Sequence, residues 1–222
     1  MPQESRMPTS RRRGSEPDRQ VALAQYRRRA WAYDLELLPF EPIRRQAIAW
    51  LALPPGSTVL DVGCGTGLSF EGLRRAVGVH GRVIGIEQSP EMIERARQRV
   101  RRHGWRNLQL LVAAAEDAAV ALQADAALLH FTHDVMQSDA ALQLLLQQLK
   151  PGATVVASGL KWAPAWALPV NLFVGPAAWY SVTSLAGLDR PWQKLADRIG
   201  EPELRFLLGG GVYLARFRVP AR

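Results

Sequence analysis

The sequence predicts an α/β domain built on a doubly wound, seven-stranded sheet that is mostly parallel, with an antiparallel last strand and helices on both faces. Between residues 57 and 159 short apolar runs alternate with amphipathic stretches, the order that builds a parallel sheet covered on both faces. A glycine-rich turn follows the first apolar run, and Gly209-Gly210-Gly211 separates the last two runs as the turn of a hairpin. The length of 222 residues, 48% of them hydrophobic, suits one substantial domain rather than two.

The N-terminal part of the chain is expected to precede this domain's sheet without adding a strand. Residues 1–18 are polar and rich in Pro and Arg, and we expect a disordered basic tail. The single domain over 19–222 then begins with a helical cap over 19–56. Its helices are expected over 19–38 and 42–52, the second ending before Pro54-Pro55-Gly56.

Residues 57–159 form the predicted core of strands and helices. The clearest helix start is Ser89-Pro90-Glu91, where a capping serine, a first-turn proline and an acid follow one another. Gly104 is expected to end that helix. The predicted strands of the core are 58–62, 82–87, 108–112, 126–131 and 154–158, and its other helices end near Val77 or cover 140–149.

The pattern changes after Leu160. Residues 160–190 read as an irregular aromatic insertion, interrupted by three prolines. Residues 191–222 are expected to supply a helix over 191–199 and the hairpin strands 204–208 and 212–219.

The net charge of +8 does not by itself indicate a nucleic-acid partner. Residues 1–30 hold eight arginines and three acidic residues, so most of the excess lies in the tail. A solvated tail explains it more simply than a dedicated RNA- or lipid-binding arm, and we expect no specific nucleic acid and at most a weak contact with membrane surfaces. No apolar run has transmembrane length, and no signal-peptide core follows the N-terminus, so a cytoplasmic protein is expected.

The single cysteine, Cys64, excludes an internal disulfide framework and a zinc site built from several cysteines, and we expect no metal. No basic partner lies near it in the sequence, so it reads as a packing residue rather than a nucleophile.

The most informative segment is the loop after the first strand, Val59-Leu60-Asp61-Val62-Gly63-Cys64-Gly65-Thr66-Gly67. A glycine loop at the carboxyl end of such a strand is where open α/β sheets bind cofactors. A dinucleotide loop needs Gly or Ala at the position of Leu68, and a phosphate-binding loop needs a Gly-Lys-Ser/Thr sequence that is missing here. The acidic Asp61 disfavours a pyrophosphate and suits a cationic amine.

A second acid completes the pattern. Glu87 ends the second strand, where a carboxylate accepts hydrogen bonds from the two hydroxyls of a ribose. A nucleoside that carries an amino-acid tail meets both requirements, and S-adenosylmethionine (SAM) is such a molecule, with S-adenosylhomocysteine (SAH) as its product.

Three stretches of the core resemble class I, Rossmann-like, SAM-dependent methyltransferases, especially the bacterial small-molecule and quinone-pathway branch. They are residues 59–67, the run Gly85-Ile86-Glu87-Gln88-Ser89-Pro90-Glu91-Met92, and Leu149-Lys150-Pro151-Gly152. Ala32-Tyr33-Asp34 is similar to an N-terminal segment that folds over the cofactor in this family. The resemblance implies an enzyme that transfers a methyl group, and it does not specify the acceptor.

The resemblance also implies roles for particular residues. Gly63 and Gly65 would meet the methionine end of SAM, Asp61 its ammonium group and Glu87 its ribose. Gln88 and Met92 would lie beside the adenine, although core packing explains Met92 equally well. The predicted cofactor-binding residues are Asp61, Gly63, Cys64, Gly65, Gly67, Glu87, Gln88, Met92, Ala115, Glu116 and His130.

One position departs from the family pattern. An acid that accepts the adenine amino group commonly follows the third strand, and here that position aligns with Ala114. Glu116 or Asp117 can substitute after a small shift, or backbone groups at Ala115 can suffice. Alternatively, both acids only begin a short solvated helix.

The residues after the fourth strand are the candidates for catalysis. His133 is placed to deprotonate an acceptor and Asp134 to orient it, although His133 serves equally well as a cap or packing residue. Tyr33, Trp162, Trp166 and Asn171 are expected to line an acceptor pocket. The preferred function is methyl transfer from SAM to O, N or C of a small hydrophobic or aromatic acceptor; RNA or protein methylation, or a non-catalytic SAM-binding partner subunit, are the alternatives.

Overall fold

The computed structural model describes residues 37–164, 166–181 and 185–221. The predicted tail over 1–18, nearly all of the helix expected over 19–38, and Tyr33 lie outside these residues.

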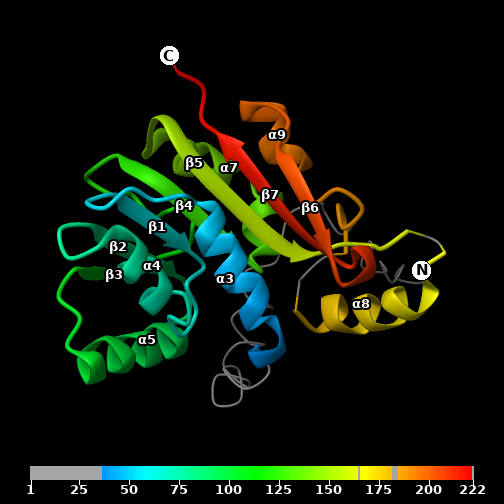
Figure 1. Ribbon diagram of the computed structural model, residues 1–222, viewed down its shortest axis with the longest axis horizontal. Helices are drawn as coiled ribbons and strands as arrows, with labels where there is room; N and C mark the ends of the chain where they lie inside the picture. Colours follow the sequence, from blue (N-terminus) through cyan, green and yellow to red (C-terminus); the bar gives the residue numbers. More distant parts are fainter. Residues whose placement is uncertain (1–36, 165, 182–184, 222) are drawn as a thin grey trace, which may run out of the picture.

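The predicted fold class is confirmed by one sheet with the strand order β3-β2-β1-β4-β5-β7-β6 (Figure 1). Strand β7 runs antiparallel to both of its neighbours, and the first five strands pair in parallel. Chain order reverses direction between β1 and β4, so a switch point for ligand binding lies at their carboxyl ends. The strands are β1 Thr58–Val62, β2 Arg82–Glu87, β3 Leu108–Val112, β4 Ala124–His130, β5 Leu149–Leu160, β6 Glu203–Leu207 and β7 Val212–Arg218.

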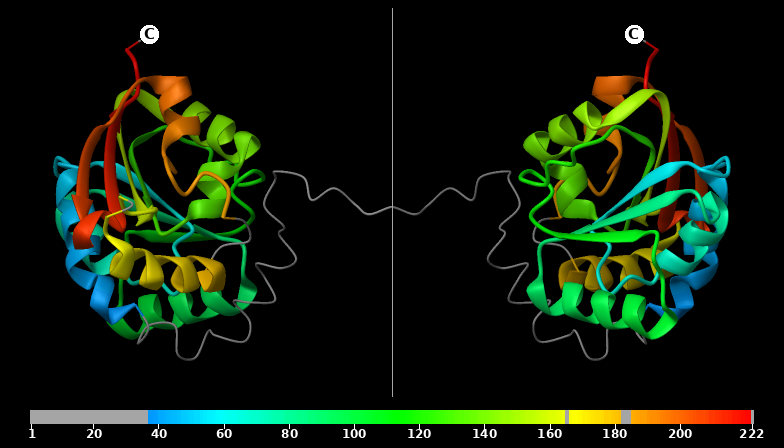
Figure 2. Two further views of the ribbon diagram at one scale, coloured as in Figure 1. Left: turned by 90° about the vertical axis from the view of Figure 1, so that its right-hand side faces the viewer. Right: turned by 90° about the vertical axis from the view of Figure 1, so that its left-hand side faces the viewer.

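Helices cover both faces of the sheet, in the layered arrangement of doubly wound folds (Figures 1 and 2). Helices α3, α4 and α5 pack on one face, and α6, α7 and α9 pack on the other. Helix α8 lies near the carboxyl ends of the strands, beside the tip of the terminal hairpin. The helical segments are η1 Leu38–Phe40, α3 Glu41–Trp50, α4 Phe70–Val77, α5 Pro90–His103, α6 His133–Gln137, α7 Asp139–Gln147, α8 Leu168–Ser181, α9 Gln193–Ile199 and η2 Leu208–Gly210.

The core is divided by the sheet into two apolar clusters. Ile43, Phe70 and Ile93 bring α3, α4 and α5 onto one face. Leu142 and Leu195 bring α7 and α9 onto the other. Burial of these side chains supplies the main driving force for folding and keeps the strands that carry the loops in register.

The second strand–helix unit has the ends that its sequence predicts. The Ser89 hydroxyl accepts a hydrogen bond from the backbone N–H of Met92 at 3.3 Å, which caps α5. Gly104 ends the helix in the left-handed conformation, with a φ of 63°. Helix α5 is therefore capped at both ends by the residues that the sequence indicates.

Two expectations need correction. Strand β5 begins at Leu149 rather than 154, because residues 150–153 form an irregularity in its pairing with β4 and not a separate turn. The aromatic insertion contains a 14-residue helix, α8, although its prolines predict an irregular segment. Pro169 occupies the first turn of α8, where a missing N–H costs no helical hydrogen bond.

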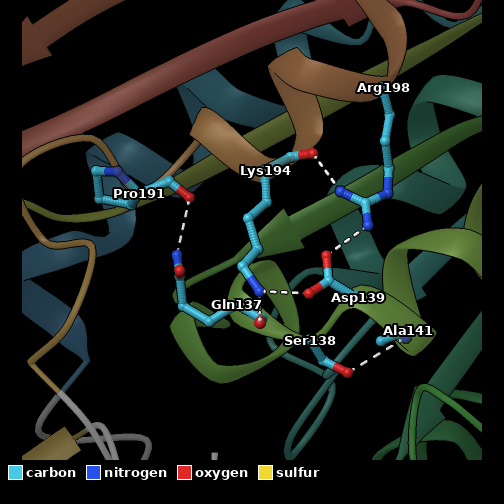
Figure 3. A network of polar contacts seen from close by, with 7 residues as sticks. All are labelled: Gln137, Ser138, Asp139, Ala141, Pro191, Lys194 and Arg198. Atoms are coloured by element: carbon cyan, nitrogen blue, oxygen red, sulfur yellow. Dashed lines mark hydrogen bonds and ion pairs between the residues drawn. The ribbon is translucent and has the colours of Figure 1, made fainter. Parts of the chain in front are cut away.

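A polar network holds α6 and α7 against α9 (Figure 3). The Asp139 carboxylate accepts hydrogen bonds from Lys194, at 2.6 Å, and from Arg198. Lys194 also donates to the backbone carbonyl of Gln137, and the amide of Gln137 donates to the carbonyl of Pro191. The network fixes the far end of α6, the short helix that begins at His133.

Candidate functional site

The glycine loop lies at the carboxyl ends of β1 and β4. Gly63, Gly65 and Gly67 have φ values of 70°, 55° and 81°, in the region that side-chain-bearing residues avoid. A Cβ on Gly63 would lie 2.4 Å from Cγ2 of Thr132, in the segment after β4. Glycine is therefore required at this position both by the backbone conformation and by the close approach of the β4 segment.

Glu87 supports this loop from the neighbouring strand. Its carboxylate accepts hydrogen bonds from the backbone N–H of Gly65, at 3.1 Å, and of Ser89, at 2.8 Å. Burial raises the pKa of Glu87, and the N–H groups of Ser89, Gly65 and Gln88 oppose that rise. Each carboxylate oxygen still has a lone pair to accept a ligand hydroxyl.

Asp61 is a buried acid with an unused oxygen. Its side chain is 1% exposed, and Oδ2 has no hydrogen-bond partner in the described part of the chain. Burial raises the pKa of Asp61 to about 7, Arg44 opposes the rise, and Glu87 adds to it. A cation placed beside Oδ2 would relieve the cost of ionising this carboxyl.

Arg44 is a site residue that the sequence reasoning missed. It projects from α3, is 3% exposed and forms an ion pair with Glu41. The signal in the sequence is its position three residues before the buried Ala47, on the apolar side of α3. In an arginine-rich chain this spacing is easily overlooked.

His130 ends β4 beside these residues. Its Nδ1 lies 2.7 Å from the Ser158 hydroxyl of β5, and its Nε2 is buried without a hydrogen-bond partner in the described residues. Burial and, secondly, the charge of Arg44 lower the pKa of His130 to about 3. The imidazole is therefore neutral at physiological pH.

Several of these groups, but not Glu87, line one cavity. Four of the predicted cofactor-binding residues, Asp61, Gly63, Cys64 and His130, line it together with Arg44. Its other lining residues are Leu37, Thr66, Leu68 and Ser69. Burial and the acids Asp61 and Glu87 raise the pKa of the Cys64 thiol, which keeps it protonated.

The remaining predicted cofactor residues are not among those that line this cavity. Gly65 contacts Glu87, Gly67 closes the turn into α4, and Met92 is buried at 1% exposure. Gln88, Ala115 and Glu116 follow β2 and β3 at the same edge of the sheet, and 115–117 form a turn rather than the start of a helix.

His133 lies at the start of α6, outside the residues that line the cavity. Its Nε2 lies 3.0 Å from the backbone carbonyl of Ala186 and must donate the proton, so Nδ1 carries the free lone pair. Nδ1 is buried without a hydrogen-bond partner among the described residues. Burial lowers the pKa of His133, whereas the Ala186 hydrogen bond and the nearby Asp134 oppose that change.

Of the predicted acceptor-pocket residues, Tyr33 lies outside the described residues, and the other three differ in their surroundings. Trp162 is partly buried against Gly175, whereas Trp166 is 81% exposed. The side-chain amide of Asn171 bonds both backbone groups of Ala163, at 2.8 and 3.1 Å, and so fixes the segment before α8. Among the described residues, no group of three or more His, Cys, Asp or Glu side chains is arranged to hold a metal ion.

Comparison with known sequences gives one family and several partial relatives. A family described as "Methyltransferase domain" matches residues 53–169. A 2-phytyl-1,4-naphtoquinone methyltransferase of Trichormus variabilis is 33% identical over 117 residues, 50% of this chain and 49% of that protein. A trans-aconitate 2-methyltransferase of Pseudomonas paraeruginosa is 32% identical over 150 residues, 68% of this chain and 48% of that protein. The matches span 13% to 49% of the length of such curated relatives.

A solved structure agrees with the fold. The N-methyltransferase NodS from Bradyrhizobium japonicum, in complex with SAH, superposes with a TM-score of 0.66 at 21% identity. The alignment covers 90% of this chain and 98% of that one. At this identity the likeness shows a shared fold and no shared substrate.

Proposed function

This chain belongs to the methyltransferase-domain family, and we propose that it transfers a methyl group from SAM to an oxygen, nitrogen or carbon atom of a small, hydrophobic or aromatic acceptor. Open α/β sheets bind their ligands at the carboxyl ends of the strands, the edge at which the described cavity lies. The proposal adds to family membership a set of binding residues and an acceptor class.

The observation that carries the proposal is the unpartnered Oδ2 of Asp61, buried beside the glycine loop. A buried carboxylate without a hydrogen-bond donor is costly, and an ammonium group supplies both charge and donors. Glu87, one strand away, is the acceptor for the ribose hydroxyls. The two acids are separated by the loop whose glycines permit close approach of a ligand to the backbone.

When bound, SAM supplies a methyl group made electrophilic by its sulfonium. The residues of this chain then have three tasks. Asp61 and the glycine loop hold the amino-acid end, and Glu87 holds the ribose. His133, if its Nδ1 faces the acceptor, takes up the acceptor proton, since its Nε2–H is already committed to Ala186.

Proximity alone is the competing description of the chemistry. An electrophilic methyl group needs mainly alignment with its acceptor, and a fixed geometry contributes several orders of magnitude in rate.

The preference for an apolar acceptor rests on residues 160–188, which contain Lys161 as their one charged residue. No acid in this segment would bind a cationic acceptor.

Titration calorimetry with SAH, SAM and NAD tests the cofactor. We expect both sulfur nucleosides to bind and NAD not to bind, because Leu68 occupies a position where dinucleotide loops carry Gly or Ala. Binding of NAD alone would overturn the proposal. Asp61→Asn, which preserves the size of the side chain, should weaken SAH binding, whereas Asp125→Asn, at the opposite end of the sheet, should not.

The acceptor class is tested by incubating the protein with SAM and a metabolite extract and searching for compounds that gain one CH2 unit. A gain on an aromatic or apolar compound supports the proposal. Gains confined to RNA or protein added in parallel would favour those substrates instead. Binding of SAH without any methyl transfer would identify a non-catalytic subunit.

A further inference from the structure

The helix α8 has an apolar face that nothing in the described structure covers. Trp166, Leu168 and Leu172 are 81%, 66% and 77% exposed. Leu208, at the neighbouring hairpin tip, is 57% exposed. These four residues are called the α8 face below. Large apolar side chains gathered on one surface of a monomer mark an interaction site.

The other side of α8 is already used for packing. Ala167 and Val174 are buried, and Val170 and Val174 lie against Gly211 at the start of β7. Asn171, a polar residue of the helix, hydrogen-bonds the backbone of Ala163 with its side-chain amide. The helix therefore has apolar side chains on both its inward and its outward side, a pattern that water alone does not favour.

The hairpin tip contributes a leucine under backbone strain. Leu208 has a φ of 49°, a conformation that favours Gly or Asn. Helix α8 contacts this tip, and the two lie side by side in Figures 1 and 2. An exposed leucine in a strained conformation is consistent with a requirement for an apolar side chain at that position.

Charge identifies the kind of surface that fits. The segment from 160 to 188 contains no acidic residue, and the ammonium of its one charged residue, Lys161, donates to the carbonyls of Trp162 and Gly210 near the hairpin tip. The next residue along the chain, Asp189, lies close enough to act on that charge. The chain as a whole carries +8, and residues 1–30, with eight arginines and three acids, supply +5 of it. We propose that the α8 face inserts into the interfacial layer of an anionic phospholipid bilayer, with Trp166 at headgroup depth and Leu168, Leu172 and Leu208 below it.

A second copy of the chain fits this face less well. Two copies would bring together surfaces of the same sign, each with Lys161 beside the contact. A stable dimer draws on about 20–30 residues from each partner, many more than the α8 face offers. An apolar anchor combined with positive charge is, by contrast, the pair of signals that gives stable binding to anionic bilayers.

The bilayer contact also has a consequence for the site. Helix α8 belongs to the part of the chain that follows β5, at the same sheet edge as the cavity. Docking this edge on a bilayer would place an apolar acceptor dissolved in lipid close to the enzyme. The membrane contact itself does not depend on the proposed methyl transfer, and its test measures no activity.

Vesicle flotation of the full-length protein tests the proposal. The probes are vesicles of phosphatidylcholine and vesicles of an equal mixture of phosphatidylcholine and phosphatidylglycerol. We expect binding to the mixed vesicles, weaker binding to phosphatidylcholine alone, and a decrease at high salt. The triple variant Trp166→Ser, Leu168→Ser, Leu172→Ser should lower the partition coefficient by at least about tenfold, since each lost apolar side chain weakens insertion.

Two further variants separate insertion from folding. Leu208→Asn places a residue that tolerates positive φ at the tip, so it should preserve or raise the melting temperature while weakening vesicle binding. Val79→Ser is the matched control, because Val79 is also 81% exposed but lies before β2, at the opposite edge of the sheet. It should bind vesicles as the wild type does.

The proposal is overturned if the wild type binds neither kind of vesicle, or if the α8-face variants bind as well as the wild type. The second result would assign binding to the basic charge alone. A wild-type dimer in solution that the triple variant converts to a monomer would assign the α8 face to self-association, and would also overturn it.

Discussion

The two halves of the carboxyl edge of the sheet differ in how their polar groups are held. Around β1 and β2, Glu87 accepts two backbone hydrogen bonds and the glycine loop is fixed by its conformation, and Oδ2 of Asp61 lacks a partner among the described residues. Around β4 and β5, Nε2 of His130 and Nδ1 of His133 are buried without partners among the described residues, and α8 leaves apolar side chains exposed. The first half therefore leaves a buried carboxylate oxygen for a ligand, whereas the second half leaves imidazole nitrogens and an apolar surface.

This difference has a physical reason. The groups around β1 and β2 recognise one cofactor with backbone N–H groups and two acids, so a short motif specifies them. An acceptor site depends on which side chains several separate segments bring together, and its chemistry varies within one fold. Mutations in the first half should therefore change the SAH affinity and the pH dependence of stability, and mutations in the second half should change the rate of methyl transfer.

The largest expected effect concerns His133. We expect His133→Gln to lower the single-turnover rate by about 10²–10⁴-fold, which corresponds to about 3–5 kcal/mol of transition-state stabilisation. SAH affinity should stay nearly unchanged because the proposed role of His133 is toward the acceptor and not toward the cofactor. The exposed His80 supplies the control variant His80→Gln. A rate within a few fold of wild type would leave proximity as the mechanism and would remove His133 from the catalytic residues.

The next effect concerns the charge of Asp61. Its pKa is raised from 3.8 to about 7 in the folded protein, so protonated Asp61 stabilises the fold fully below pH 3.8. That contribution, up to about 4 kcal/mol, is lost as the pH rises through about 7. We expect Asp61→Asn to remove this dependence from the melting temperature of the free protein.

The ligand should reverse the trend. An ammonium group favours ionised Asp61, so the thermal stabilisation by SAH should grow between pH 6 and pH 8 in the wild type and stay nearly constant in Asp61→Asn. Equal pH profiles for the two proteins would show that the ammonium group of the ligand does not bind beside Asp61.

Glu87 should give a smaller effect that combines affinity and stability. Removing the carboxylate in Glu87→Ala is expected to weaken SAH binding by about 1–3 kcal/mol. Because Glu87 also bonds the N–H groups of Gly65 and Ser89, Glu87→Ala should lower the melting temperature as well. Glu87→Gln retains an acceptor oxygen, so its free energy of unfolding should fall by less than its free energy of SAH binding. Unchanged SAH affinity in both variants would exclude Glu87 from the ribose site.

The smallest expected effect concerns the network behind α6. Asp139 is well exposed, so Asp139→Asn should cost less than about 1 kcal/mol of stability. The hydrogen bonds from Lys194 and Arg198 lower the pKa of Asp139, so its contribution should be present at neutral pH and lost below about pH 4. Melting curves at pH 7 and in strong acid check this. If Asp139→Asn lowered the free energy of unfolding by several kcal/mol, the ion pairs of Asp139 would stabilise α6 more than exposed ion pairs usually do.

The sequence by itself determined the elements whose signals lie within a few neighbouring residues. The strands β1 and β2, the helix start at Ser89 and the glycine loop follow from apolar runs, capping and positive φ, which are local properties. Asp61 and Glu87 were predicted for the same reason, because each ends or nearly ends a strand whose direction was already known. The parallel pairing of the first strands and the antiparallel direction of the last strand followed from the connections, whereas the strand order came from the structure.

Only the tertiary structure decided which distant residues meet and which surfaces stay uncovered. Arg44 reaches the cavity because α3 packs against the sheet through Ala47, a contact between segments far apart in the chain. Helix α8 forms in a proline-interrupted segment because the glycines of the hairpin tip let Val170 and Val174 pack closely. Local patterns record propensity and burial along one element, whereas these contacts depend on the relative placement of several elements, which no single window of sequence contains.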